Sequence, residues 1–271
     1  DAQESAAANS FGANAGIIVG DRGIIVVDTL VSAREARRFI EDVRKISDKP
    51  IRYIINTHYH LDHSFGNAEF AGLGATIVAH VNCADEMRHK AAAALAGAAD
   101  FGLTPEDMGG TRIAYPEITF TDKLRLDLGG VEAELIFIAP AHSKGSIVVS
   151  VPREKVVFAG DILFTEYHPY MGEGDIEGWQ RNLDFLATLG SERIIPGHGP
   201  LSGNEDLADM KAYLTLFDNK ARELTAAPGK LEEMTAQMKA VLPARKQAEW
   251  LIGASLQGKY LTGTAQDENK R

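Results

Sequence analysis

Short β-branched runs alternate with amphipathic stretches along the chain. The runs at 15–20 ("AGIIVG") and 23–28 ("GIIVVD") are separated by Asp21 and Arg22, a spacing that predicts a hairpin. A helix is expected next, because Ser32 and Glu35 form a capping box and apolar residues follow at helical spacing. These inward positions are Ala36, Phe39, Ile40, Val43 and Ile46. The run 51–55 ("IRYII") is then typical of a buried strand.

The same layout repeats further along. A strand at 75–80 ("ATIVAH") precedes an alanine-rich helix at about 82–98 and a loop with Pro105 and Pro116. From Ile118 onward, the runs "EITF", "KLRLDL", "EAELIFI", "SIVVSV" and "KVVFAG" predict strands, with turn residues between them. A helix follows at 176–189, with Trp179, Leu183, Leu186 and Leu189 facing inward and Asp175 as its N-terminal cap, and "ERIIPG" is the last strand.

Strands followed by helices, twice over, predict an α/β (α+β) architecture in which two sheets pack together with helices outside. We expect a flexible segment at 1–13, a core at 14–203, a C-terminal helical part of the same domain at 204–260 and a flexible tail at 261–271. The C-terminal helices could cover a cleft and select substrate, extend the outer layer or form a dimer contact. Trp250 and Tyr260 are interpreted as packing residues.

Composition narrows the classes of protein. The chain has 271 residues, 45% of them hydrophobic, and a net charge of -10 without any basic stripe, so a nucleic-acid partner is not expected. No run is long enough to span a membrane. Cys83 is the only cysteine, which excludes an internal disulfide, and it is interpreted as a small buried residue at a helix start. The polar beginning "DAQESAAANS" suits a mature end after signal cleavage or a cloned fragment, and favours export.

The stretch "NTHYHLDHSFGN" (56–67) concentrates three of the chain's 8 histidines directly after a predicted strand. His58 and His60 are two residues apart, so in extended backbone both side chains project the same way and one ion could touch both. Asp62 and His63 follow at once and supply a carboxylate and an imidazole to a neighbouring position. This loop therefore predicts a metal site with room for a second ion.

Three later segments place a similar side chain at a strand end. They are "FIAPAHSKG" with His142, "VVFAGDILF" with Asp161 and "RIIPGHGP" with His198. Strand-end loops are where a rigid scaffold presents functional groups. The neighbouring glycines let backbone pass close to a crowded site, and they are Gly145, Gly160, Gly197 and Gly199.

The motif "HYHLDH" (H-x-H-x-D-H), followed in this order by His142, Asp161 and His198, resembles the metallo-β-lactamase superfamily over about residues 14–200. The resemblance implies a four-layer αβ/βα sandwich, in which two mixed β-sheets are flanked by helices and the metal site lies at one edge of the sheets. It also implies that His58, His60 and His142 hold one metal, that Asp62, His63 and His198 hold the other, and that Asp161 bridges them.

The implied chemistry is a dinuclear zinc-dependent hydrolase that uses a bridging hydroxide against a small ester, thioester, lactone or amide. Asp62 would orient the attacking water. Two zinc ions per chain are expected, although the same ligands suit iron or manganese. The site would stay near +1 with its hydroxide, which favours anionic or oxyanion-forming small substrates. The oligomer is left open between a monomer and a homodimer.

Other functions stay open. β-Lactamases of this superfamily usually carry cysteine or serine where this chain has Asp161, so the resemblance is to glyoxalase-II-type thioesterases and lactonases more than to antibiotic hydrolysis. β-Lactamase activity is an alternative. An iron-dependent sulfur dioxygenase on the same scaffold is another, and a metal-binding protein without turnover is a third.

Several residues near these motifs have simpler interpretations. His80 is expected to be a structural histidine, His89 a solvated one and Lys144 a free surface lysine. The loop 163–174, with Tyr167, His168 and Tyr170, is interpreted as an inert surface loop, with a role in lining the substrate mouth as the alternative.

Overall fold

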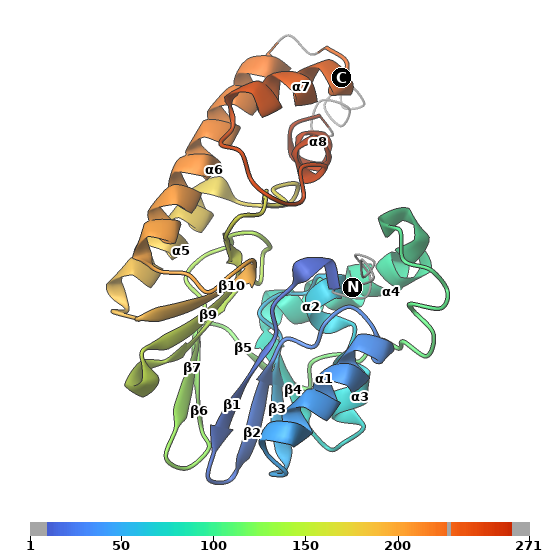
Figure 1. Cartoon of the computed structure of the whole chain (residues 1–271), viewed down its shortest axis with the longest axis vertical. Coiled ribbons are helices and arrows are strands. Elements are labelled where there is room, and N and C mark those ends of the chain that lie inside the picture. The colour runs from blue at the N-terminus through green and yellow to red at the C-terminus, as the bar shows by residue number, and fades with distance from the viewer. Residues whose placement is uncertain (1–9, 227–228, 262–271) are drawn as a thin grey trace.

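The computed structural model describes residues 10–226 and 229–261, in which two five-stranded sheets face each other (Figure 1). The first sheet has the order β1-β2-β3-β4-β5. Its strands are β1 (Gly16–Gly20), β2 (Gly23–Val27), β3 (Ile51–Ile55), β4 (Thr76–His80) and β5 (Ile118–Phe120). The β1–β2 hairpin is antiparallel, as its spacing predicted, and the remaining neighbours run parallel.

The second sheet has the order β10-β9-β8-β7-β6. Its strands are β6 (Lys123–Asp127), β7 (Glu132–Ile136), β8 (Val148–Val151), β9 (Val156–Phe164) and β10 (Arg193–His198). Only the β9–β10 pair is parallel. Both sheets are therefore mixed, as the resemblance implied.

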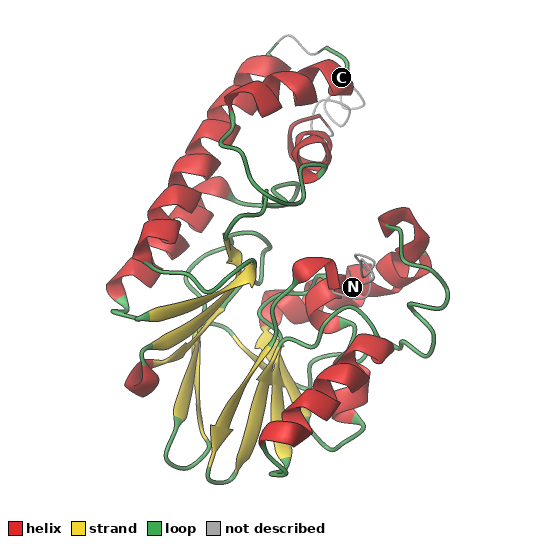
Figure 2. Ribbon diagram, in the orientation of Figure 1, coloured by secondary structure: helices red, strands yellow, loops and turns green. Residues whose placement is uncertain are grey.

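Helices cover the outer face of each sheet, which makes four layers (Figure 2). On the first sheet lie α1 (Ala33–Ile46) and α3 (Asn67–Ala71), and α4 (Val81–Ala96) follows β4. On the second lie α5 (Ile176–Thr188) and α6 (Asn204–Thr225). Beyond them come α7 (Leu231–Val241), α8 (Leu251–Ser255) and the π-helical turn η4 (Leu256–Leu261). The remaining short helical turns are η1 (Ser10–Gly12), α2 (Leu61–Ser64), η2 (Ala98–Phe101) and η3 (Pro152–Glu154).

Local sequence signals explain where the main helices begin. The Ser32 side chain accepts a hydrogen bond from the Glu35 backbone N–H at the start of α1, and Asp175 accepts one from Gly178 at the start of α5. Both caps were predicted, and each satisfies a backbone donor that the helix leaves free. The inward face of α1 ends earlier than expected, because Ile46 in its last turn is 70% exposed.

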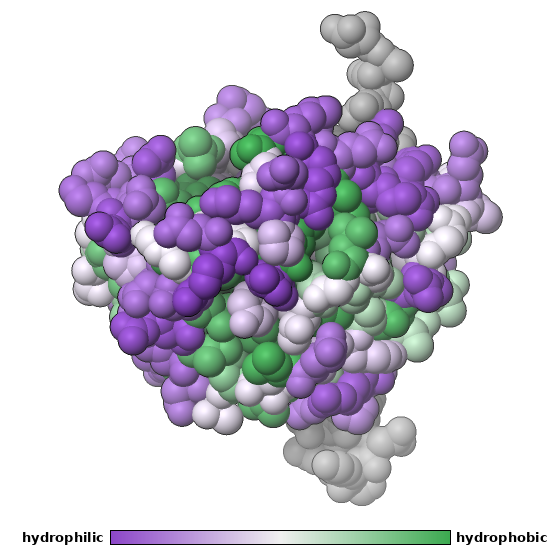
Figure 3. Space-filling view, turned by 90° about the horizontal axis from the view of Figure 1, so that it is seen from below, coloured by the Kyte–Doolittle hydropathy of each residue, from purple (hydrophilic) through white to green (hydrophobic). Residues whose placement is uncertain are grey.

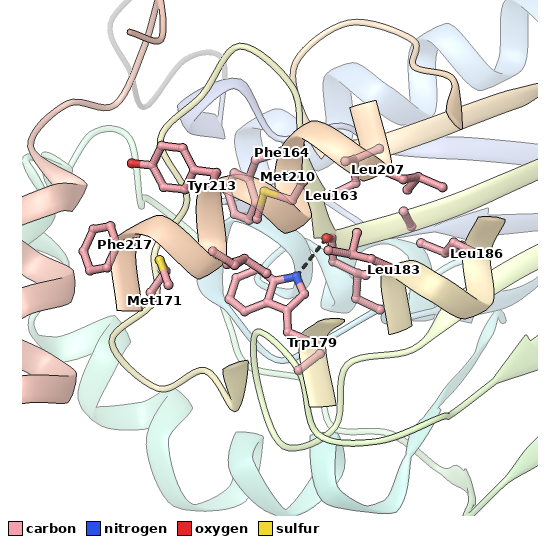
Figure 4. Close-up of a cluster of buried hydrophobic side chains, with 14 of the residues drawn as sticks. Leu163, Phe164, Met171, Trp179, Leu183, Leu186, Leu207, Met210, Tyr213 and Phe217 are labelled. Carbon is pink, nitrogen blue, oxygen red and sulfur yellow. Dashed lines mark hydrogen bonds between the residues drawn. The ribbon is translucent and has the colours of Figure 1, made fainter. Parts of the chain in front are cut away.

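The hydrophobic core has three large parts that correspond to the layers. One lies between α1, α3 and the first sheet, and a second lies between the two sheets. The third joins the second sheet to α5 and α6 around the fully buried Trp179, whose indole N–H donates to the backbone oxygen of Ile162 at 2.8 Å (Figure 4). Each sheet is thus buried on both faces, which fixes the edge where the strand-end loops meet.

Two predicted elements differ from the structure. The strand "EITF", expected to open the second group of strands, pairs with β4 as β5 and completes the first sheet. Asp161, expected just after a strand, lies inside β9, since that strand continues to Phe164 through register shifts in its pairing with β10. Such irregularities redirect side chains, and here the redirected side chain is that of Asp161.

The outside of the molecule mixes residue types. In the face shown in Figure 3, hydrophilic residues alternate with smaller hydrophobic areas. Among the described residues, no helix is long and apolar enough to cross a membrane. The predicted tail lies outside the described residues except for Leu261, the last residue of η4.

Candidate metal centre

The seven residues singled out in the sequence lie together at one edge of the two sheets. His58 and His60 follow β3, Asp62 and His63 lie in the short helix α2, His142 lies in the loop after β7, Asp161 lies in β9, and His198 ends β10. Their donor atoms form two groups that could hold a metal ion, His58–His60–His142–Asp161 and Asp62–His63–His198, with all atoms of a group within 4.8 Å of one another. Asp62 and His63 were expected in a loop, but a helical turn presents them.

The Asp161 carboxylate lies between the two groups. Its Oδ2 is 3.2 Å from His142 Nε2 and 3.6 Å from His58 Nε2. Its Oδ1 is 3.1 Å from His63 Nε2 and 3.5 Å from His198 Nε2. One oxygen therefore faces each group. Any side chain at Gly197 would collide with this carboxylate, since a Cβ there would lie 1.9 Å from Oδ1, so the close approach of β10 needs glycine.

Distances inside each group are equally short. His142 Nε2 lies 2.8 Å from His60 Nδ1 in the first group. In the second group, His198 Nε2 lies 3.3 Å from Asp62 Oδ2 and 3.4 Å from His63 Nε2. Five imidazoles and two carboxylates thus point their donor atoms at a common centre.

Hydrogen bonds on the far side of the rings fix their orientation. The Nδ1–H of His142 donates to the backbone oxygen of Tyr170 at 3.0 Å, and that of His198 donates to the backbone oxygen of Phe11 at 3.2 Å. His58 Nδ1 donates to the Thr57 hydroxyl at 3.1 Å. Because the Nδ1–H groups of these rings are held by acceptors outside the centre, Nε2 is the atom of each ring that faces the centre and could bind a cation there.

Asp28 is a residue of this site that the sequence reasoning missed. Its Oδ2 accepts from His63 Nδ1 at 2.9 Å and from the Thr57 hydroxyl at 2.7 Å, and its Oδ1 accepts from the Thr57 backbone N–H at 2.8 Å. The carboxylate thus orients His63 directly and His58 through Thr57, one imidazole of each group. It follows a buried strand in "GIIVVD", the same strand-end signal that marked the other candidates.

Burial raises the pKa of the Asp28 carboxyl above its usual value, although His63 and the bonds from Thr57 act to lower it. Its backbone has a positive φ of 60°, in the left-handed region that aspartate tolerates better than most residues. The surrounding hydrogen bonds hold this conformation, and such local strain is common at functional sites.

We expect Asp28→Asn to weaken metal binding about 10- to 100-fold, the usual cost of losing a carboxylate that orients a metal-binding imidazole. The amide would keep the size of the side chain but could not accept from both His63 and Thr57 as the carboxylate does. Competition with a chromophoric chelator would give the affinity, and circular dichroism would check the fold. An affinity equal to that of the wild type would show that Asp28 has no orienting role.

The pKa values of the histidines differ between the two donor groups. Burial lowers the pKa of His58 well below its usual value and that of His142 to about 3, so both rings are neutral. Burial would also lower the pKa of His198, but the carboxylates of Asp161 and Asp62 raise it to about 9, and they raise that of His63 well above its usual value. The carboxylates, in turn, keep low pKa values beside these rings.

A cleft of about 780 Å³ opens over the cluster. Its walls include Tyr167 and Tyr170, so interpreting their loop as inert was wrong for these two residues. The segment 247–258 forms another wall, which agrees with the cleft-covering option for the C-terminal helices. Trp250 lines this wall and is 60% exposed, so its interpretation as a packing residue was wrong, whereas Tyr260 packs against Phe217.

The remaining single residues follow their simpler interpretations in most cases. His80 is buried, caps α4 and donates to the Thr121 backbone oxygen at 2.7 Å, so it is structural. His89 and Lys144 are exposed, and Cys83 is buried in α4. His168 is also buried, with its Nδ1 2.7 Å from the Tyr213 hydroxyl, and it does not line the cleft.

Two helix-covered mixed sheets with a histidine and aspartate cluster at their common edge define an αβ/βα sandwich with a candidate metal site. The sequence pattern that describes the Metallo-beta-lactamase superfamily matches residues 9–198, and the chain belongs to this superfamily, whose members are metal-dependent hydrolases. The resemblance inferred from the motif is thereby confirmed.

Curated relatives carry several different activities in their names. The chain is 30% identical over 199 residues to the 2,4-dinitroanisole O-demethylase subunit alpha of Nocardioides sp., covering 72% of this chain and 56% of that protein. It is 26% identical to a linear primary-alkylsulfatase of Pseudomonas sp., covering 72% and 43%. The chain thus spans about half the length of these two relatives. It is also 24% identical to the acyl-coenzyme A thioesterase MBLAC2 of Bos taurus, covering 72% and 76%.

Solved structures show the same fold. A metallo-beta-lactamase family protein from Thermus thermophilus superposes with a TM-score of 0.68 at 21% identity, covering 93% of this chain and 89% of that one. A metallo-beta-lactamase from Pontibacter korlensis gives 0.62 at 18% identity, covering 73% and 85%. At these identities, the likeness concerns the fold alone.

Proposed function

We propose that the protein is a dinuclear zinc-dependent hydrolase that cleaves a small ester, thioester, lactone or amide. His58, His60 and His142 would hold one ion, Asp62, His63 and His198 would hold the other, and Asp161 would bridge them. The observation that carries the proposal is the Asp161 carboxylate, which turns one oxygen to each of two compact donor groups. A single ion would contact only one of these groups, and the donor atoms of the other group would have no cation to bind.

The donor set fits cations. His58 Nε2 and Asp161 Oδ1 are buried and have no hydrogen-bond partner among the described residues. Leaving buried polar atoms unpaired is costly, and a cation would satisfy both. Donor atoms on a tetrahedral zinc ion lie about 3.3 Å apart, given Zn–N distances of about 2.0–2.1 Å. The separation is 3.2 Å between His142 Nε2 and Asp161 Oδ2 in the first group and 3.3 Å between His198 Nε2 and Asp62 Oδ2 in the second. Imidazole with carboxylate suits zinc best among the common ions.

Bound zinc ions would supply a hydroxide nucleophile at neutral pH and polarise the bond that is attacked. Asp62 lines the cleft and its side chain is 15% exposed, so it is placed to accept a hydrogen bond from the attacking water and to orient it. Asp161 keeps the two donor groups at a fixed separation. Since the ions make the nucleophile, no serine or cysteine of the chain has to act as one.

Protons should compete with the ions for the second group. The carboxylates raise the pKa of His198 to about 9, so at pH 7 this imidazole holds a proton that a metal ion must displace. The affinity should therefore rise with pH up to about 9 and level off above it. Zinc uptake should release protons at pH 7 and fewer at pH 10. Titration calorimetry in buffers of different ionisation enthalpy measures this release, and a proton count of zero at pH 7 would contradict the raised pKa.

Metal content and substrate choice together test the proposed function. Zinc-replete protein should contain about two zinc ions per chain, and chelation should abolish turnover. The substrate panel consists of p-nitrophenyl esters, S-lactoylglutathione, a homoserine lactone, nitrocefin, octyl sulfate and bis-p-nitrophenyl phosphate. Turnover of a p-nitrophenyl ester, of the thioester or of the lactone supports the proposal, and a metal-replete protein that turns over none of these three classes would contradict it.

The alternatives predict other results from the same experiment. Turnover of nitrocefin alone would indicate a β-lactamase, an activity that Asp161 at the bridging position disfavours. One iron per chain together with oxygen consumption would indicate a sulfur dioxygenase. Each of the two groups brings together at least three residues with donor atoms, which favours two bound ions over one.

A further inference from the structure

The cleft above the cluster is built mainly from hydrophobic side chains that belong to distant parts of the chain. They include Phe11 of η1, Leu61 and Phe65 around α2, Phe101 of η2, and Trp250 and Leu251 at α8. Figure 1 shows α8 above and α4 to the right of the edge where the strands of the two sheets end. A volume of about 780 Å³ lies in the range of sites that enclose a small ligand.

Two large aromatic side chains of this cleft are open to solvent. Phe101 is 45% exposed and Trp250 is 60% exposed. Scattered exposed hydrophobic residues are ordinary, but these two belong to one continuous apolar cleft that leads to the cluster. Covering them with an apolar group would remove their surface from water, which is favourable. Binding of an apolar ligand in the cleft is therefore favourable.

The charges of the cleft away from the cluster are already balanced or negative. Lys90 is the only lysine or arginine among the described residues that line it. Its Nζ lies 2.6 Å from Glu173 Oε2 and 3.2 Å from Glu86 Oε1, and the Tyr59 hydroxyl donates to Glu173 at 2.7 Å. One cation thus faces two carboxylates. A substrate with a second anionic group, such as a phosphate or a distal carboxylate, would find no unpaired cation in this wall.

We propose that the cleft selects substrates whose acyl group is an uncharged apolar chain, and that Phe101 and Trp250 determine this selectivity. The inference rests on the proposed hydrolase function and narrows its substrate class. In the reaction, the hydroxyl oxygen of water bonds to the acyl carbon, the acyl–oxygen bond breaks, and the leaving alkoxide takes the proton. The products are the fatty acid and the alcohol.

A chain-length series tests the selectivity with zinc-replete enzyme. The probes are the p-nitrophenyl esters of acetate, butyrate and octanoate, together with the p-nitrophenyl half-ester of suberate, which has a carboxylate at the far end of an eight-carbon chain. Each buried methylene should raise kcat/KM about two- to fourfold, so octanoate should exceed acetate at least about fiftyfold. The suberate half-ester should fall at least about tenfold below octanoate. A flat series, or equal rates for suberate and octanoate, would overturn the proposal.

Single-residue variants test whether Phe101 and Trp250 cause the chain-length selectivity. Phe101→Ala and Trp250→Ala should each lower kcat/KM for octanoate about tenfold and leave that for acetate within about twofold, because only the long chain reaches these rings. Leu73→Ala is the matched control, since Leu73 is a large hydrophobic residue, 50% exposed, outside the cleft. It should change neither rate. Equal losses on both esters in the cleft variants would indicate a general structural effect and would contradict the proposed selectivity.

Binding gives a readout that does not need turnover. Trp179 is fully buried, so a ligand that covers Trp250 should shift only the emission of Trp250 to shorter wavelength. We expect this shift with 1-octanol, a weaker one with 1-butanol, and none with 1-octanol in Trp250→Phe. If neither the esters nor the other substrates of the panel are hydrolysed but the shift follows chain length, the hydrolase function fails and the apolar selectivity stands. If esters are hydrolysed without any shift or chain-length preference, the hydrolase function stands and the apolar selectivity fails.

Discussion

Asp62→Asn is expected to lower turnover of the best substrate at least about a hundredfold, on the scale of losing a positioned catalytic group. The amide keeps the volume of the carboxylate but lacks its charge and is a weaker acceptor for the attacking water. It also weakens the attraction to His198, whose Nε2 lies 3.3 Å from Asp62 Oδ2. Steady-state kinetics at saturating zinc should show the loss in kcat, while circular dichroism should show an unchanged fold.

His89→Ala is the matched control for this experiment. His89 is exposed on α4, outside both donor groups, so its removal should leave kcat and zinc content unchanged. Near-full activity of Asp62→Asn would refute the role proposed for Asp62. A large loss in His89→Ala would show that this histidine is more than a solvated side chain.

Trp179→Ala should give the largest loss of stability, about 3–5 kcal/mol, because it empties a fully buried site. The indole joins α5 to the second sheet through its bond to the Ile162 oxygen, which the variant would also leave unpaired (Figure 4). For a protein of this size, the melting temperature should fall by about 6–20 °C. Differential scanning calorimetry of the chelated protein measures this fall without a contribution from bound ions.

Trp250→Ala provides the matched control for stability, since the same side chain is removed from a site that is 60% exposed. Surface changes of this kind usually stay within about 0.5 kcal/mol. Equal melting temperatures for the two variants would contradict the picture of Trp179 as a central packing residue. The Trp179 ring also lies 5.3 Å from that of His142, so a weaker metal affinity should accompany the lower stability.

The cluster could be read from the sequence because its members share a local signal. His58, His142 and His198 each follow or end an apolar run, and sheets bring strand ends together at an edge. Asp28 carries this signal too, but a single aspartate after a strand is common in any protein. Only the packing of β2 beside β3, which brings its carboxylate to Thr57 and His63, distinguishes it from an ordinary turn residue.

The residues that line the cleft could not be predicted from the sequence in this way. Trp250 and Phe101 are separated by about half of the chain, and neither belongs to a motif. Their common position depends on how the C-terminal helices pack against α6 and how the turn after α4 lies, and these are long-range contacts. Hydrophobic periodicity identifies a helix face that is buried, but it does not identify an apolar side chain left in solvent for a ligand.

The sequence by itself determined the helix-covered strands and the grouping of histidines and aspartates at strand ends, because period and spacing are local properties of the chain. The tertiary structure decided which sheet receives β5, how the irregular pairing of β9 turns Asp161 toward both donor groups, and which side chains line the cleft. These features depend on contacts between residues far apart in sequence, and such contacts are fixed only when the two sheets and their helices pack together.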